Sequence, residues 1–96
     1  MRSGRHRAAW SAIADEALRK KAYGRHNGRG PIHKILAEAA DSALEDATED
    51  ERKVYKLRYV EGMNSQMASE KLYMSERSYY RTLNRLIRRV EERLLG

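Results

Sequence analysis

Residues 64–83 read NSQMASEKLYMSERSYYRTL, a pattern typical of a short helix, a tight turn and a second helix. Ala68 is small enough to stand where the two helix backbones approach each other. The apolar residues expected to close the angle between the helices are Met67, Leu72, Met74 and Tyr79. Ser75 is expected to cap the second helix, because its hydroxyl can accept a hydrogen bond from an otherwise unpaired N–H. The segment therefore predicts a helix-turn-helix unit.

The second of these helices has a predicted outward face of basic and polar side chains. The residues expected to read base edges of double-stranded DNA are Arg77, Tyr80, Arg81 and Asn84. Arginine matches guanine O6 and N7, and asparagine matches adenine N6 and N7. The residues expected to contact the DNA backbone are Ser65, Gln66, Lys71, Ser75, Arg85 and Arg88. The alternative is that these arginines, together with Arg89, form an ordinary solvated face.

The chain of 96 residues carries a formal net charge of +6, which favours a polyanionic partner. Residues 1–34 hold nine basic and two acidic residues, residues 35–51 hold seven acidic residues and no basic one, and residues 52–96 hold eleven basic and five acidic residues. This order suggests two DNA-facing surfaces around a segment that avoids phosphate. The alternative for the acidic segment is a solvated helix face.

Several function classes find little support in the composition. There is no cysteine, which excludes a disulfide framework and a thiolate metal site. The three histidines have no shared ligand spacing, and no serine carries a nucleophile signature. We therefore expect no metal, no cofactor and no catalytic activity. No apolar run approaches membrane length, so we expect no membrane association and a cytoplasmic location in a bacterial host cell.

Helical periodicity covers nearly the whole chain, and we expect an all-α fold of about five helices. The first two expected helices run from about Arg7 to Tyr23 and from Pro31 to about Ala47, with a loop at Gly24–Gly30 between them. A third helix is expected to open with a capping box at Thr48 and to end at Gly62. A short fourth helix would be capped by Asn64 or Ser65, and a fifth would run from about Glu76 to Leu94. Residues expected to face the core include Ile13, Leu18, Ile32, Ile35, Tyr55, Tyr59, Val60, Tyr79, Leu83, Leu86 and Val90. The hydroxyls of Tyr55 and Tyr59 are expected to reach water.

Two patterns in the second half of the chain carry a resemblance. The first pattern is Leu57-Arg58-Tyr59, within the segment Glu51–Gly62. The second is the sequence SERSYYR at Ser75–Arg81. The combination resembles the DNA-binding module of sigma factors that reads the −35 promoter element. It looks closer still to small phage late-gene transcriptional activators of the ArpU/RinA type. The resemblance covers about residues 49–92, and Tyr73 stands where such turns often carry a glycine or another small residue.

The resemblance implies a sequence-specific DNA-binding transcriptional regulator encoded by a phage or prophage, with RNA polymerase as a further partner. We expect residues 1–48 to form a basic arm and two amphipathic helices, and residues 49–96 to form the sigma-like helix-turn-helix, within one compact domain. Arg2, Arg5 and Arg7 are either an arm that contacts DNA or a disordered tail. The alternative functions are a small terminase subunit for DNA packaging and a sigma-like adaptor that binds RNA polymerase or another regulator.

The last predicted helix also raises the question of self-association. Its apolar residues with 4-3-4 spacing are Leu83, Ile87, Val90 and Leu94. This spacing suits a helix–helix seam and predicts a homodimer, because regulators of this kind often bind two half-sites. The competing interpretation is a monomer whose seam is filled within the chain by Trp10, Ile13 and Leu18.

Overall fold

The computed structural model describes residues 3–23 and 31–96. Its elements are α1 (Ser3–Tyr23), α2 (Pro31–Asp46), α3 (Glu49–Tyr55), the π-helical turn η1 (Lys56–Val60), α4 (Ser65–Lys71) and α5 (Glu76–Leu95). Every regular element within these two ranges is helical, which confirms the prediction of an all-α fold with about five helices. Arg2 and the loop predicted at Gly24–Gly30 lie outside the described residues.

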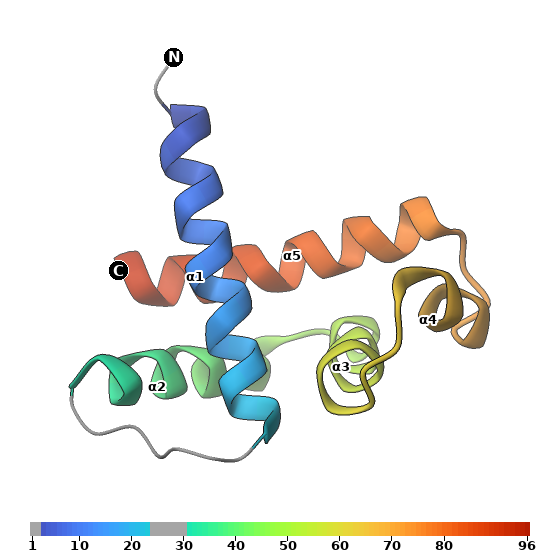
Figure 1. Ribbon diagram of the computed structural model, residues 1–96, viewed down its shortest axis with the longest axis horizontal. Helices are drawn as coiled ribbons and strands as arrows, with labels where there is room; N and C mark the ends of the chain where they lie inside the picture. Colours follow the sequence, from blue (N-terminus) through green and yellow to red (C-terminus); the bar gives the residue numbers. More distant parts are fainter. Residues whose placement is uncertain (1–2, 24–30) are drawn as a thin grey trace.

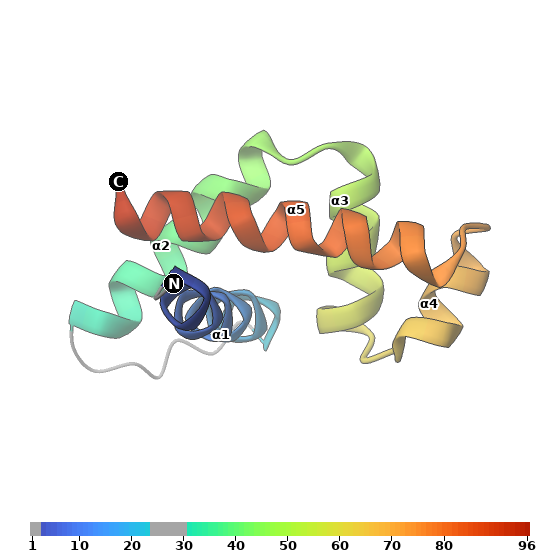
Figure 2. The same ribbon diagram turned by 90° about the horizontal axis from the view of Figure 1, so that it is seen from above.

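Helix α5 is the element around which the others pack (Figure 1). It runs along the length of the molecule, with α2 and α3 on one side and α1 crossing it steeply. Helix α4 lies beside the N-terminal end of α5, at the opposite end of the molecule from the first turns of α2 (Figure 2). All four other α-helices contact α5, so this helix links the alanine-rich first half of the chain to the segment 64–83.

The core is one cluster of side chains drawn from all these elements. Its alanines are Ala14, Ala17, Ala39, Ala40, Ala43, Ala47 and Ala68, and its large members include Leu18, Val54, Tyr79, Leu86 and Val90. Alanines at the contacts of α1 and α2 let these helices approach α5 closely. The proposed dimer seam on α5 is mostly used inside the chain, because Leu83 and Val90 are buried and Ile87 and Leu94 pack against the core.

Some apolar residues that the sequence pattern assigned to the core lie at the surface. Met67 is 54% exposed, because the inward positions of the short helix α4 are Ala68 and Ser69. Ile32 and Ile35 are exposed on the first turns of α2, which reach past the C-terminal end of α5 in both views. At these two positions the apolar stripe of α2 continues beyond the end of α5, where no described helix covers it. Ile13 on α1 is also exposed.

The third predicted helix contains a change of helical period. It is α-helical to Tyr55 and continues as η1, where the Glu61 N–H donates to the Lys56 carbonyl at 2.9 Å. The wider turn changes the register, so Leu57 and Tyr59 point inward while Val60 is exposed. Simple 3.6-residue periodicity placed Val60 in the core and was wrong there.

The predicted caps are confirmed. Thr48 and Glu51 form a reciprocal capping box at the start of α3, and Asn64, rather than Ser65, caps α4 by accepting from the Met67 N–H at 2.8 Å. Ser75 caps α5 by accepting from the Ser78 N–H at 3.1 Å. Gly62 has a φ of 73°, the left-handed conformation that glycine adopts without strain.

Candidate nucleic-acid interface

The starts of α4 and α5 are joined by a side-chain hydrogen bond. The Ser65 hydroxyl, in the first turn of α4, donates to the Glu76 carboxylate, in the first turn of α5, at 3.2 Å. Behind this contact, Ala68 of α4 and Tyr79 of α5 are fully buried. The prediction of Tyr79 as a core residue is confirmed, and Ala68 is a fully buried small residue of α4. Leu72 and Met74 of the turn also pack against the core.

One face of α5 is exposed and strongly basic. The residues predicted to read bases or contact phosphates on α5 all lie there, and they are Arg77, Tyr80, Arg81, Asn84, Arg85 and Arg88. Positions 77, 81, 84 and 88 follow the spacing of one helical face, and positions 80 and 85 flank it. The four arginines form no ion pair with any residue that the structure describes. Their charge is therefore available to an anionic partner.

The two remaining arginines of α5 have a different role. Arg89 donates to Glu51 of α3, with Nε 2.6 Å from Oε1, and Arg93 donates to Ser42 and Asp46 of α2. The interpretation that grouped Arg89 with the solvated or DNA-facing arginines is therefore corrected. Position 89 follows Arg85 by one helical turn, so helical spacing alone does not separate it from the basic face; its contact with Glu51 does.

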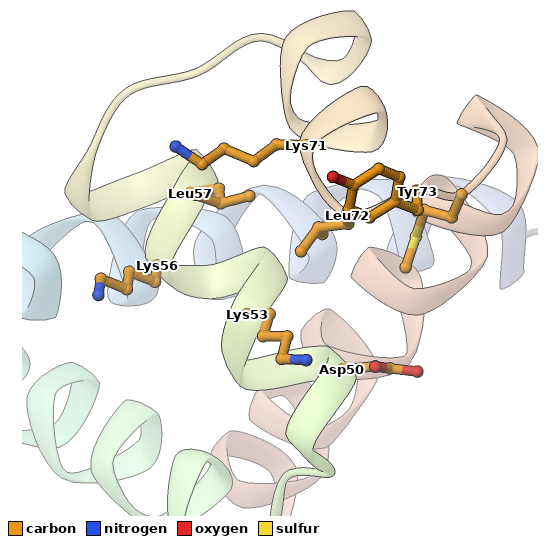
Figure 3. A pocket seen from close by; sticks show the side chains of 8 residues that line it. Asp50, Lys53, Lys56, Leu57, Lys71, Leu72 and Tyr73 are labelled. Carbon is orange, nitrogen blue, oxygen red and sulfur yellow. The ribbon is translucent and has the colours of Figure 1, made fainter.

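The residues predicted to contact the DNA backbone do not all lie together. Ser65 and Gln66 begin α4, close to the start of α5, and Ser75 is exposed but uses its hydroxyl in the helix cap. Lys71 lies at the opposite end of α4, where it lines a groove with Lys53 of α3 and Lys56 of η1 (Figure 3). The other residues that line this groove come from α3, η1 and the turn between α4 and α5.

Glu76 also belongs to this surface, although its sequence position does not predict a binding role. It is exposed in the first turn of α5, next to Arg77, and Ser65 orients its carboxylate. A carboxylate that reaches a base edge accepts a hydrogen bond from the N4 amino group of cytosine. Its position directly after the cap Ser75 was a usable signal, but acidic residues are also favoured in any first helical turn, which hides a binding role.

The first turns of α1 project past α5, on the side that neither α2 nor α3 covers (Figure 1). The backbones of Arg5 and Arg7 belong to these turns, because α1 begins at Ser3 rather than at about Arg7. Farther along α1, the Ser11 hydroxyl donates to Glu91 of α5 at 2.6 Å. The two helices are therefore tied together close to the exposed face of α5.

A polar cluster fixes α1 against η1, next to the α4–α5 unit. The buried Tyr59 hydroxyl donates to Asp15 at 2.5 Å, and Asp15 also accepts from Arg19. The guanidinium groups of Arg19 and Arg58 lie 5.7 and 5.5 Å from the centre of the Tyr59 ring. Burial, together with the Asp15 carboxylate, raises the pKa of Tyr59 well above its ordinary value. The expectation that this hydroxyl reaches water was wrong; it is bonded within the protein.

Comparison with models of protein families, with curated proteins and with solved structures finds no match for this chain. None of the helices in residues 3–23 and 31–96 is long and apolar enough to cross a membrane. Within the same ranges, no three His, Asp or Glu side chains gather as a metal ion would require.

Proposed function

We propose that this protein is a sequence-specific, double-stranded DNA-binding transcriptional regulator of the phage or prophage type. The observation that carries the proposal is the exposed face of α5, where four arginines without an acidic partner among the described residues surround Asn84 and Tyr80. A row of free guanidinium groups has a favourable partner in the DNA phosphates, and the same groups recognise guanine edges. Residues 77–88 of α5 hold four arginines and no acidic residue, whereas an ordinary solvated face is expected to mix acids with its bases.

The dimensions of α5 suit the major groove. Residues 76–88 make about 18 Å of helix at 1.5 Å per residue, and the groove of B-DNA, about 12 Å wide, admits one helix. In this mode of binding, Asn84 and Arg81 would reach base edges, and Arg85 and Arg88 would meet the phosphates on either side. Ser65 and Gln66, at the start of α4, would meet the backbone of one strand.

The packing of α5 supports this mode of binding. Its inner face is held by Tyr79, Leu83, Leu86 and Val90 in the core, and its cap Ser75 is in place. The helix is therefore presented as a rigid rod, which keeps the loss of conformational entropy on binding small. The likeness to ArpU/RinA-type activators and to the sigma-factor module adds the regulatory role and RNA polymerase as a further partner.

The experiment starts from a preferred site, obtained by repeated selection of random duplexes on the full-length protein. Arg81→Ala and Asn84→Ala should each weaken binding to that site by about 1–3 kcal/mol and relax the preference at one or two positions. Arg88→Ala is the matched control, and it should weaken preferred and random duplexes equally. If selection enriches no sequence, or if all three variants lose affinity equally on both kinds of duplex, sequence-specific recognition by α5 is wrong.

A further inference from the structure

A groove separates α3 and η1 from the turn between α4 and α5 (Figure 3). Its volume is about 340 Å³. Lys53, Lys56 and Lys71 surround it, and Leu57 and Leu72 lie between these lysines. The groove therefore combines an apolar interior with a basic rim, and it is separate from the basic face of α5.

The charge around the groove is largely uncompensated. Lys53 lies 3.8 Å from Glu49 in a pair whose members are both exposed, an arrangement that contributes little. Lys56 and Lys71 form no ion pair with any residue in the described part of the chain. Asp50 adds a single carboxylate to the lining. The groove consequently favours an anionic occupant.

Tyr73, beside the groove, adopts a backbone conformation that does not suit it. Its φ is 58°, in the left-handed region, where a residue other than glycine loses roughly 1–2 kcal/mol. Its side chain is 96% exposed, so the ring gains no burial that would compensate for this strain. An aromatic ring held in a strained turn at the mouth of a groove contributes nothing evident to folding, but it provides a large contact area for a partner.

The acidic segment of a second copy is a poor occupant, because much of its charge is neutralised within the chain. Asp41 pairs with Lys21 at 2.6 Å, Asp46 pairs with Arg93, and Glu51 pairs with Arg89. A DNA duplex presents its phosphates on the outside, whereas its apolar groups, such as the thymine methyls, lie inside the grooves, away from a rim that pairs with phosphates. An acidic peptide with an aliphatic or aromatic side chain satisfies both the rim and the interior.

We propose that this groove binds a short acidic segment of a partner protein. Carboxylates of the segment pair with Lys53, Lys56 and Lys71, one apolar side chain enters between Leu57 and Leu72, and the Tyr73 ring packs over it. The residues that would contact the peptide are distinct from the base-reading residues of α5. The segment and DNA can therefore occupy the protein together, and the proposal does not depend on DNA recognition.

The test is selection of a displayed library of random dodecapeptides on the full-length protein, followed by fluorescence anisotropy with the enriched peptides. We expect the enriched peptides to be acidic and to contain an apolar residue. Lys56→Glu should weaken their binding at least tenfold, whereas Lys34→Glu, the same charge reversal on the exposed surface of α2, should leave it nearly unchanged. The Lys34→Glu control removes the effect of net charge.

Tyr73→Gly gives a second, opposite pair of readouts. This variant should melt at a higher temperature, because glycine relieves the strain at φ 58°, and should nevertheless bind the peptides about tenfold more weakly. Enrichment of peptides without acidic character, or enriched peptides that bind Lys56→Glu as they bind the wild type, would overturn the proposal. The proposal would also be overturned if Lys56→Glu bound DNA more weakly than Lys34→Glu does and bound the peptides as well as the wild type does. The groove would then be a DNA-binding surface.

Discussion

Arg89 and Glu51 join the C-terminal half of α5 to the start of α3. The Arg89 Nε donates to Glu51 Oε1 at 2.6 Å, and the same oxygen accepts the Thr48 N–H at 3.3 Å. Glu51 is only 1% exposed, so its charge depends on these two donors. The hydrogen bond to the Glu51 carboxylate also raises the pKa of Arg89. One carboxylate therefore completes a helix cap and anchors the proposed recognition helix.

Arg89→Ala should destabilise the protein strongly, because it leaves a buried carboxylate without its cation. Removing one partner of a buried pair costs roughly 3 kcal/mol or more, although the partial exposure of Arg89 favours the lower end. Arg88→Ala, on the exposed neighbour, should change stability by less than about 0.5 kcal/mol. Urea unfolding of both variants measures the difference. Equal stabilities would mean that water replaces Arg89 around Glu51 without loss.

This contact also shows how far the sequence could predict the structure. The caps at Thr48, Asn64 and Ser75 were predictable, because each depends on residues within three positions of one another. The capping box at Thr48 was predictable, but Arg89, which donates to the Glu51 of this box, is 38 residues away from Glu51. No local pattern distinguishes such a pair from other arginines and glutamates.

The same reasoning applies to the rest of the candidate site. The exposed face of α5 followed from helical spacing, whereas the bond between Tyr59 and Asp15, 44 residues apart, did not. The π-helical turn at η1 also escaped prediction, since it shifts the register at Val60 without a glycine or proline to mark it. The prediction that Lys71 contacts the DNA backbone rests on its charge, whereas its place beside Lys53 and Lys56 in the groove depends on the tertiary fold.

Glu76→Ala should remove discrimination at one base pair of the preferred site. If the Glu76 carboxylate accepts a hydrogen bond from a cytosine N4 amino group, the wild type should bind more weakly when that base pair is replaced. The Glu76→Ala variant should bind both sites equally well, which is a loss of about 1–3 kcal/mol of selectivity. Binding to random duplexes should become tighter, because a negative charge near the phosphates is removed. Glu70→Ala, which removes another exposed carboxylate, on α4, is the control for net charge. Competition binding with single-base variants of the site measures both effects, and unchanged selectivity would exclude Glu76 as a reader.

Tyr59 should make stability dependent on alkaline pH. Burial and the Asp15 carboxylate raise the pKa of Tyr59 in the folded protein. The contribution of Tyr59 to the free energy of unfolding is therefore fully present below the ordinary tyrosine pKa of about 10, and it is lost as the pH rises above that value. The free energy of unfolding of the wild type should therefore fall above about pH 10 more steeply than that of Tyr59→Phe. Burial also raises the pKa of Tyr55, so the Tyr59 contribution is read from the difference between the two proteins. Tyr73→Phe, on an exposed ring, should follow the wild type; parallel curves for all three would contradict a raised Tyr59 pKa.

A protein that starts at Ala8 tests whether the basic N-terminal residues bind DNA. The deletion removes Arg2, Arg5 and Arg7, but it keeps the core residues Ala14, Ala17 and Leu18 of α1 and the bond from Ser11 to Glu91. Helical content should therefore fall only by the deleted turns, and the melting temperature should change little. Every arginine that neutralises a phosphate adds about 0.9 to the slope of log K against log salt, so a slope smaller by up to about 3 is expected.

Lys34→Ala, on the exposed side of α2, controls for the loss of charge remote from the proposed interface. An unchanged slope in the truncated protein would show that α5 and α4 bind DNA without these arginines, even though the first turns of α1 project on the open side of α5.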